Sequence, residues 1–253
     1  MAAQMGWRGT LESWTEMTSD ELSSQHREAR EPLYTTDVHA FLAQDITLVV
    51  EAASQAVCRE IAPQVLVLVA GKDLMPMSVG AFADESFLQQ MRDLAREHGR
   101  CVYLPSGAIG GLDALSAGAI DELDEVVLTT TKPPHALERA SMEQDVDLTT
   151  ITEPTCIYDG PAIEAVRLFP KNVNVAAAIS LAGAGVERTR VRIVADPEAT
   201  GNSHRVEARG RLGAFTIELH LHPSPDNPRT SYLAVLSAIR TLKNLSEPIR
   251  FGG

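Results

Sequence analysis

Between residues 37 and 105, runs of consecutive apolar residues alternate with stretches in which apolar residues recur at helical spacing. The apolar runs 46–50, 65–69 and 101–104 predict three buried strands, with Cys101 in the core. A short helix is predicted to follow the first strand and to end near Ala62. A second helix is predicted from Asp84, a suitable N-cap, to a stop at Gly99. Apolar strands that alternate with helices indicate a parallel sheet covered on both faces, here half of a doubly wound sheet.

From about residue 105 the pattern changes. Residues 125–131 predict a strand, and residues 159–169 and 172–186 predict helices, the second with Asn172 as N-cap. Three strands with polar alternation are then predicted at residues 190–195, 204–209 and 214–221. Such alternation is typical of an antiparallel sheet with one face in water. The fold class predicted is therefore α/β: a partial Rossmann-type parallel sheet followed by an α+β domain with a mainly antiparallel open sheet.

The end of the chain predicts one more helix, capped by Thr230. Its apolar stripe consists of Leu233, Leu236, Ile239 and Leu242. We expect this helix, residues 230–245, to pack back on an incomplete NAD(P)-binding domain at residues 37–105. Residues 106–229 then form the substrate, catalytic and dimerisation domain. Residues 1–36 are acidic, offer at most a short helix at residues 19–30, and are expected to be an atypical, poorly packed segment.

Composition narrows the function classes. The chain has 253 residues, 44% of them hydrophobic and 22% charged, which is ordinary globular usage and excludes disordered and collagen-like classes. No apolar run reaches the ~20 residues of a membrane span, and the first residues do not predict a secretory signal, because they lack a basic segment followed by an apolar core. The net charge of −12 argues against nucleic acid as a partner, whereas a small anionic substrate needs only a few cations. The three scattered cysteines suggest neither a disulfide framework nor a zinc site, and they fit a cytoplasmic protein without metal.

A dinucleotide-binding domain normally opens with a strand, a GxGxxG turn and a helix whose N-terminal amides hold the pyrophosphate. No GxGxxG occurs in this sequence. Two explanations remain open at this stage. Either the chain lacks the first half of its nucleotide domain, or residues 1–36 are a divergent replacement for it.

Three segments carry candidate chemistry. The glycine-rich loop at residues 105–115 follows the third predicted strand, where it can expose backbone amides to a ligand or serve as an interdomain hinge. Lys171 stands at a predicted helix N-terminus, which is either an anion site or a simply capped core helix. His204 stands at the entrance of an amphipathic strand, as a general acid or base or as a structural histidine.

Taken together, these segments resemble the L-aspartate dehydrogenase family, which is related in architecture to homoserine dehydrogenase and dihydrodipicolinate reductase. The resemblance spans residues 37–250 in unbroken order. It is carried by residues 48–54 (LVVEAAS), 70–75 (AGKDLM), 77–81 (MSVGA), 105–115, 132–134 (KPP), 168–178 (LFPKNVNVAAA), 195–197 (ADP), 201–204 (GNSH) and 225–231 (PDNPRTS).

The resemblance implies NAD- or NADP-dependent oxidative deamination of L-aspartate to iminoaspartate, which can feed NAD synthesis, by a cytoplasmic homodimer. Carried over by position, the family's active-site histidine falls on His204, and its cofactor contacts fall on Ala108 and Asn174. The substrate carboxylates need cations, for which Lys171 is the best placed, followed by Arg229 and Lys72.

Two alternatives stay open. The chain can be a truncated, non-catalytic relative that acts as a binding or dimerising module, because an unpaired sheet edge invites association. It can also be a related NAD(P)-dependent reductase of another small amino acid or imine. Cofactor binding separates the first alternative from the enzyme, and the number of cations facing His204 separates the substrates.

Overall fold

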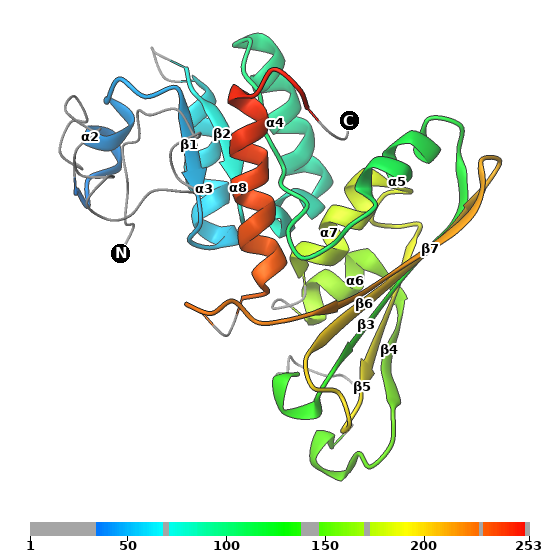
Figure 1. The fold of residues 1–253 in the computed structure, drawn as a ribbon. Coiled ribbons are helices and arrows are strands. Elements are labelled where there is room, and N and C mark those ends of the chain that lie inside the picture. Colours follow the sequence, from blue (N-terminus) through cyan, green and yellow to red (C-terminus); the bar gives the residue numbers. More distant parts are fainter. Residues whose placement is uncertain (1–33, 68–70, 138–146, 170–172, 228–229, 251–253) are drawn as a thin grey trace.

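The computed structural model describes residues 34–67, 71–137, 147–169, 173–227 and 230–250. Two sheets organise this part of the chain: a small parallel sheet and a larger five-stranded one. Figure 1 shows the small sheet and its helices on the left and the long twisted sheet on the lower right. The predicted N-terminal segment and its possible helix at residues 19–30 lie almost wholly outside the described residues.

The N-terminal part holds the parallel sheet. Its elements are α2 (Val38–Leu42), β1 (Leu48–Glu51), α3 (Gln55–Val67), β2 (Asp73–Pro76), the 3₁₀ helix η2 (Val79–Ala83) and α4 (Glu85–Glu97). Strands β1 and β2 run parallel, with Val49 opposite Leu74. Helix α4 begins where the sequence predicts, because the Asp84 carboxylate accepts hydrogen bonds from the amides of Ser86 and Phe87. The parallel strand–helix prediction is confirmed here.

Three details of the N-terminal prediction are wrong. Residues 65–67 of the second predicted strand belong to helix α3, whose buried residues Cys58, Ala62, Val65 and Leu66 follow helical spacing. The second strand is instead β2, which the prediction missed because Asp73 opens it. The third predicted strand is reduced to a single parallel bridge between Val102 and Leu74, and Cys101 is exposed rather than in the core.

The C-terminal part is built on the five-stranded sheet. Its elements are α5 (Leu112–Ala119), β3 (Leu123–Lys132), η3 (Pro134–Ala136), η4 (Leu148–Thr150), β4 (Thr155–Pro161), α6 (Ala162–Leu168), α7 (Val173–Ala182), β5 (Thr189–Ala195), β6 (Asn202–Gly210) and β7 (Gly213–Leu221). The strand order is β4-β5-β3-β6-β7. Only the β3–β5 pair among these strands is parallel, so the mainly antiparallel sheet is confirmed.

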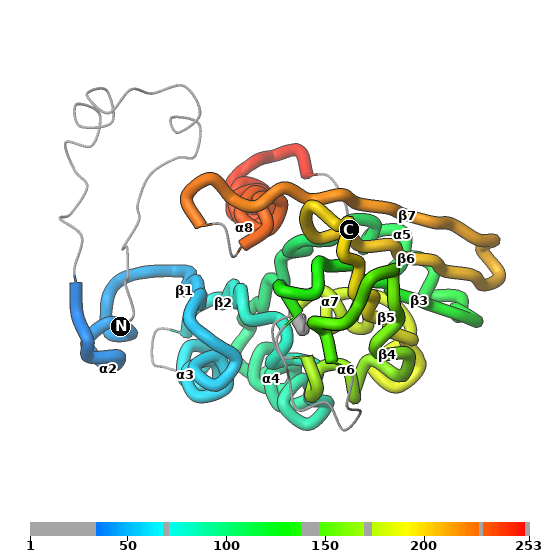
Figure 2. Tube along the Cα trace, turned by 90° about the horizontal axis from the view of Figure 1, so that it is seen from below, coloured from blue at the N-terminus to red at the C-terminus, as the bar shows by residue number. Residues whose placement is uncertain are grey.

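Strand β4 was not predicted, and residues 159–161 end this strand instead of opening a helix. The tyrosine ring of Tyr158 explains part of the difference: its hydroxyl donates to the carbonyl oxygen of Pro161 at 2.7 Å and closes the strand-to-helix turn. Helices α5, α6 and α7 lie over one face of the sheet, and the opposite face is left open (Figure 2). The open sheet of the prediction is therefore correct.

The last helix, α8 (Tyr232–Ser246), begins after Ser231 rather than after the predicted cap Thr230. Its predicted apolar stripe is only partly covered, since Leu236 and Ile239 are each more than 40% exposed. Among the described helices, none combines the length and apolar character that a membrane crossing requires.

Two hydrophobic cores meet at η2. Val79 and Ala83 belong to the core under the five-stranded sheet, whereas Ala81 and Phe82 belong to the core around α3 and α4. Leu181 of α7 packs against both cores. The short 3₁₀ helix is thus the joint at which the two parts of the molecule are held together.

Candidate functional site

His204 is the buried titratable group of the covered sheet face. Strand β6 places it between Thr130 of β3 and Leu219 of β7, and only 4% of its surface is exposed. The Nδ1 atom lies 3.0 Å from the hydroxyl of Thr130, which fixes the ring. Burial, and secondarily the charge of Lys132, lowers the pKa of His204 to about 4. The imidazole is therefore neutral at pH 7.

Lys132 is a cation that sequence reasoning did not select for the site. It follows Thr130 by two residues on β3, so both side chains face the same side of the sheet as His204. Its positive charge acts on the imidazole strongly enough to lower the pKa of His204. The sequence feature that could have identified it is the Lys-Pro-Pro motif at residues 132–134, in which the prolines mark the end of the strand that carries Lys132.

The glycine-rich loop lies against β7 beside His204. A Cβ atom at Gly110 would meet the side chain of Leu219 at 3.9 Å, and one at Gly111 would overlap Ile217 at 1.8 Å. Leu219 is the register partner of His204, so the loop covers the strand next to the imidazole. Gly111 also has a φ of 76°, which disfavours any residue with a side chain. Ala108, a half-buried residue of the same loop, packs against the core under the five-stranded sheet.

Asn174, in the first turn of α7, contacts the turn that follows β2. Its side-chain oxygen accepts a hydrogen bond from the amide of Gly80 at 2.9 Å, and its side-chain nitrogen donates to the carbonyl of Met77 at 3.2 Å. Sequence reasoning assigned Asn174 to the cofactor only. The structure adds that its amide group joins the C-terminal part to the carboxyl end of β2, the edge at which ligands bind in parallel α/β sheets.

Glu51 is a second residue that sequence reasoning did not select. It ends β1, is 3% exposed, and its carboxylate accepts hydrogen bonds from the amides of Ala53 and Ser54 at 2.7 and 3.0 Å. The same carboxylate accepts from the amide and hydroxyl of Ser78. The sequence feature that could have identified Glu51 is the Glu-Ala-Ala-Ser sequence at the end of a predicted strand, because an acidic side chain there can accept hydrogen bonds from the backbone amides of the turn that follows.

The contacts of Asn174 and Glu51 show which part of a dinucleotide cofactor the carboxyl edge of the parallel sheet can accommodate. The carboxyl edge of β1 and β2 is where a parallel α/β sheet binds a nucleotide, and Asn174 contacts the turn that follows β2 at this edge. The turn at Ala53 and Ser54 does not suit the pyrophosphate, since its amides already bond a carboxylate. Within the residues that the structure describes, the carboxyl edge of the parallel sheet is therefore present and a pyrophosphate cradle is not.

The predicted substrate cations are distributed differently. Lys171 and Arg229 lie outside the described residues. Lys72 is buried at 1% exposure immediately before β2, whereas Asn174 contacts the turn after that strand. The structure therefore places Lys72 at the opposite end of β2 from this edge, and Lys132 is the cation it brings to His204.

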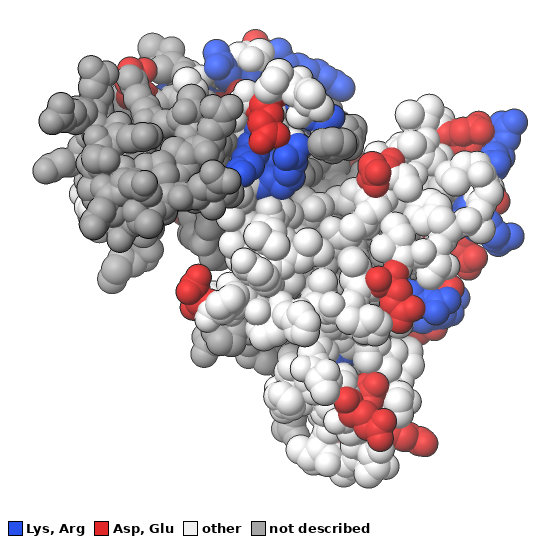
Figure 3. All heavy atoms as spheres, in the orientation of Figure 1, with Lys and Arg blue, Asp and Glu red and all other residues white. Residues whose placement is uncertain are grey.

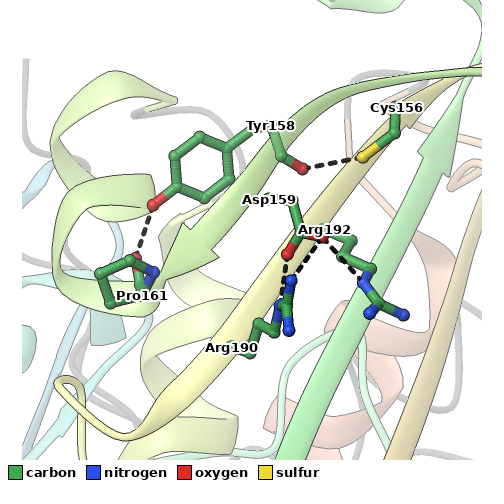
Figure 4. A network of polar contacts seen from close by, with 6 residues as sticks. All are labelled: Cys156, Tyr158, Asp159, Pro161, Arg190 and Arg192. Atoms are coloured by element: carbon green, nitrogen blue, oxygen red, sulfur yellow. Dashed lines mark hydrogen bonds and ion pairs between the residues drawn. The ribbon is translucent and has the colours of Figure 1, made fainter.

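The open face of the sheet carries charges of a different kind. Asp159 of β4 binds Arg190 with both carboxylate oxygens and also pairs with Arg192 (Figure 4). The hydrogen bond from Arg190 holds the pKa of Asp159 below its usual value. Acidic and basic side chains alternate along the border of this sheet in Figure 3. These pairs lie on the face opposite His204, because they alternate along β5 with the core residues Val191 and Ile193.

Comparison with known proteins first defines the class. Residues 12–105 match the NAD-binding domain of homoserine dehydrogenase, so the chain is an NAD(P)-dependent oxidoreductase by class, as the sequence predicts. Residues 113–245 match the C-terminal domain of aspartate dehydrogenase.

Individual relatives are more specific. The L-aspartate dehydrogenase of Methanosarcina barkeri is 46% identical over 213 residues, which cover 83% of this chain and 78% of the relative. That of Nitrosopumilus maritimus is also 46% identical, over 87% of this chain and 81% of its own. The crystal structure of aspartate dehydrogenase from Thermotoga maritima superposes with a TM-score of 0.68 at 35% identity, covering 82% of this chain and 79% of that one. The chain belongs to the L-aspartate dehydrogenase family.

Proposed function

We propose that this chain catalyses the NAD(P)-dependent oxidative deamination of L-aspartate. L-Aspartate and NAD(P)⁺ give iminoaspartate, NAD(P)H and a proton, and water then converts iminoaspartate to oxaloacetate and ammonia. The observation that carries the proposal is the neutral, buried His204 beside Lys132, in a chain 46% identical to curated L-aspartate dehydrogenases. A neutral base next to a cation suits a substrate that brings carboxylates and an amine to be deprotonated.

The chain's own residues have separate tasks in this proposal. Lys132 holds a substrate carboxylate, and Lys171 and Arg229 remain candidates for the second one. Thr130 holds the ring of His204 through Nδ1, so Nε2 faces the substrate amine or a water and accepts its proton. A bound dicarboxylate raises the pKa of His204 from its low value, which strengthens it as a base. Ala108 and Asn174 border the nicotinamide end of the cofactor, and NAD or NADP, when bound, supplies the hydride acceptor.

The test measures consumption of NADH, then NADPH, with oxaloacetate and ammonium. We expect turnover in the parent and a loss of roughly 10²–10⁴-fold in His204→Ala, the range typical of a general acid–base. His220→Ala is the matched control, because His220 is a histidine of the neighbouring strand β7 with 78% of its side chain exposed. Near-normal turnover in His204→Ala would contradict the assignment of His204.

A second candidate function is a non-catalytic binding or dimerising module, and one observation favours it. In the described parallel sheet, β1 is the strand that leads directly into an α-helix, and the amides of Ala53 and Ser54 in the turn between them already bond the Glu51 carboxylate, so they are not free for a cofactor phosphate. Titration of the folded chain with NADH by calorimetry separates the two functions. Cofactor binding together with turnover supports the enzyme, whereas a folded chain with neither supports a binding or dimerising module. Turnover with another 2-oxo acid in place of oxaloacetate would support a different amino-acid dehydrogenase.

We further propose that the protein is a cytoplasmic homodimer and that it supplies iminoaspartate for NAD synthesis. We also propose that the boundary between its two domains lies near residue 105. The open sheet face supports the dimer, because its alternating ion pairs, such as Arg205–Glu207 and Arg209–Glu125, can pair with a second copy. The free thiols of Cys58, Cys101 and Cys156 fit a reducing compartment. Light scattering of the purified chain measures its oligomeric state.

A further inference from the structure

The turn from Met77 to Gly80 is held from both parts of the molecule. From the N-terminal part, the carbonyl of Glu51 accepts from the amide of Met77 at 2.7 Å. The Glu51 carboxylate accepts from the amide and hydroxyl of Ser78 at 3.3 and 3.0 Å. From the C-terminal part, Asn174 bonds Met77 and Gly80. Every residue of the turn except Val79 therefore has a polar bond to one side or the other.

The residue between these bonds is anchored by packing. Val79 is 3% exposed and belongs to the core under the five-stranded sheet, and the turn leads directly into η2, which contributes to both cores. Figures 1 and 2 show α7, whose first turn contains Asn174, between the helices of the parallel sheet and the five-stranded sheet. Any change in the turn therefore changes how the two parts sit against each other.

We propose that Glu51 and Asn174 form a clamp on the Met77–Gly80 turn, and that this clamp sets the position of the cofactor edge relative to His204. The inference rests on the proposed dehydrogenase function for its catalytic consequence. The cofactor edge belongs to the parallel sheet, and His204 belongs to the other sheet. Hydride transfer requires the reacting atoms to be held about 3–3.5 Å apart, so the joint between the sheets controls that distance. Glu51 is a positioning residue in this arrangement, because it acts through the turn.

Burial makes the clamp rigid. Glu51 is 3% exposed, and its carboxylate receives four donors from two separate segments. Charge-assisted bonds of this kind are shorter and stronger than neutral ones. The nearby Cys58 thiol is kept protonated, since burial and the charge of Glu51 raise its pKa to about 12.

The first test uses amide hydrogen exchange and needs no activity. In Glu51→Gln, the new side-chain NH₂ group faces the donor at the Ser78 amide or hydroxyl, so at least one bond is lost. A clamp predicts that the Gly80 amide, whose own partner Asn174 is untouched, then exchanges roughly tenfold faster or more. The matched control is Asp84→Asn, because the Asp84 carboxylate also accepts hydrogen bonds from two nearby backbone amides, those of Ser86 and Phe87, which lie outside the turn. The control should leave Gly80 exchange unchanged.

A second variant keeps the test decisive if Glu51→Gln does not fold. Asn174→Asp retains the acceptor for Gly80 but places an oxygen against the carbonyl of Met77. It should speed exchange of the Ser78 amide, which Glu51 binds. If each variant changes only the amides that its own side chain contacts, the two residues are independent and the clamp is refuted.

The catalytic consequence is read from kinetics. Glu51→Gln should lower kcat by roughly 100-fold, with a larger deuterium isotope effect on aspartate oxidation and a smaller change in KM. Unchanged kcat in a variant with accelerated exchange would overturn the positioning role. A parent without turnover would refute the proposed function instead, and the exchange data would still decide whether the clamp exists.

Discussion

The two faces of the five-stranded sheet are built from the same strands but treat charge in opposite ways. On the covered face, burial keeps His204 neutral and lowers its pKa to about 4. On the open face, Asp159 stays ionised because Arg190 and Arg192 pair with it in contact with water. The two groups lie on different strands of the same sheet, and their surroundings differ because they lie on opposite faces of it. The face of the sheet, more than the residue type, decides which ionisable group is suited to catalysis.

The largest expected effect compares adjacent residues of β5. Ile193 is 1% exposed on the covered face, whereas Arg192 points to the open face with 40% of its side chain exposed. Ile193→Ala should lower the free energy of unfolding by roughly 2–5 kcal/mol, because it leaves a cavity in the core. Arg192→Ala is the control and should change it little. Urea denaturation measures both, and equal losses would mean that the two faces do not differ in packing as described.

Alternation of this kind is what the sequence reveals best. Strands β6 and β7 were predictable because polar and apolar residues alternate along them, and the start of α4 was predictable because Asp84 is a local cap. His204 could be selected from its place at the start of such a strand. The run at residues 65–69 could not be assigned, because a short apolar run fits a buried strand and a buried helix equally well.

The site residues that were missed depend on contacts distant in sequence. Glu51, which was missed, meets Ser78 across 27 positions. Asn174 was predicted as a cofactor contact, but its bond to Gly80 spans 94 positions and was not predicted. Lys132 becomes a site residue only because β3 pairs with β6 in a register that places Thr130 beside His204. No local pattern encodes that register, so the clamp and the cation beside the imidazole required the tertiary structure.

The second-largest expected effect is a pH dependence of the free energy of unfolding that comes from His204 on the covered face. The folded pKa of His204 lies near 4, below the ordinary value of 6.5, so the unfolded chain binds the proton more readily. This contribution to stability is fully present above about pH 6.5 and is lost as the pH falls toward 4, by about 3 kcal/mol. In His204→Gln, the free energy of unfolding should fall less over this window. Urea titrations at several pH values measure it, and identical slopes in parent and variant would place the imidazole in water.

The smallest effect is expected on the open face. Asp159→Asn removes the charge that binds Arg190 and Arg192, but both arginine side chains are at least 40% exposed and remain hydrated without it. The thermal midpoint at pH 7 should therefore fall by no more than about 2 °C at low salt. In 1 M salt the difference should disappear, because screening removes the attraction between exposed charges. A loss of several degrees that survives high salt would show that the open face is covered in solution, as it would be if a second copy of the chain packed against Asp159.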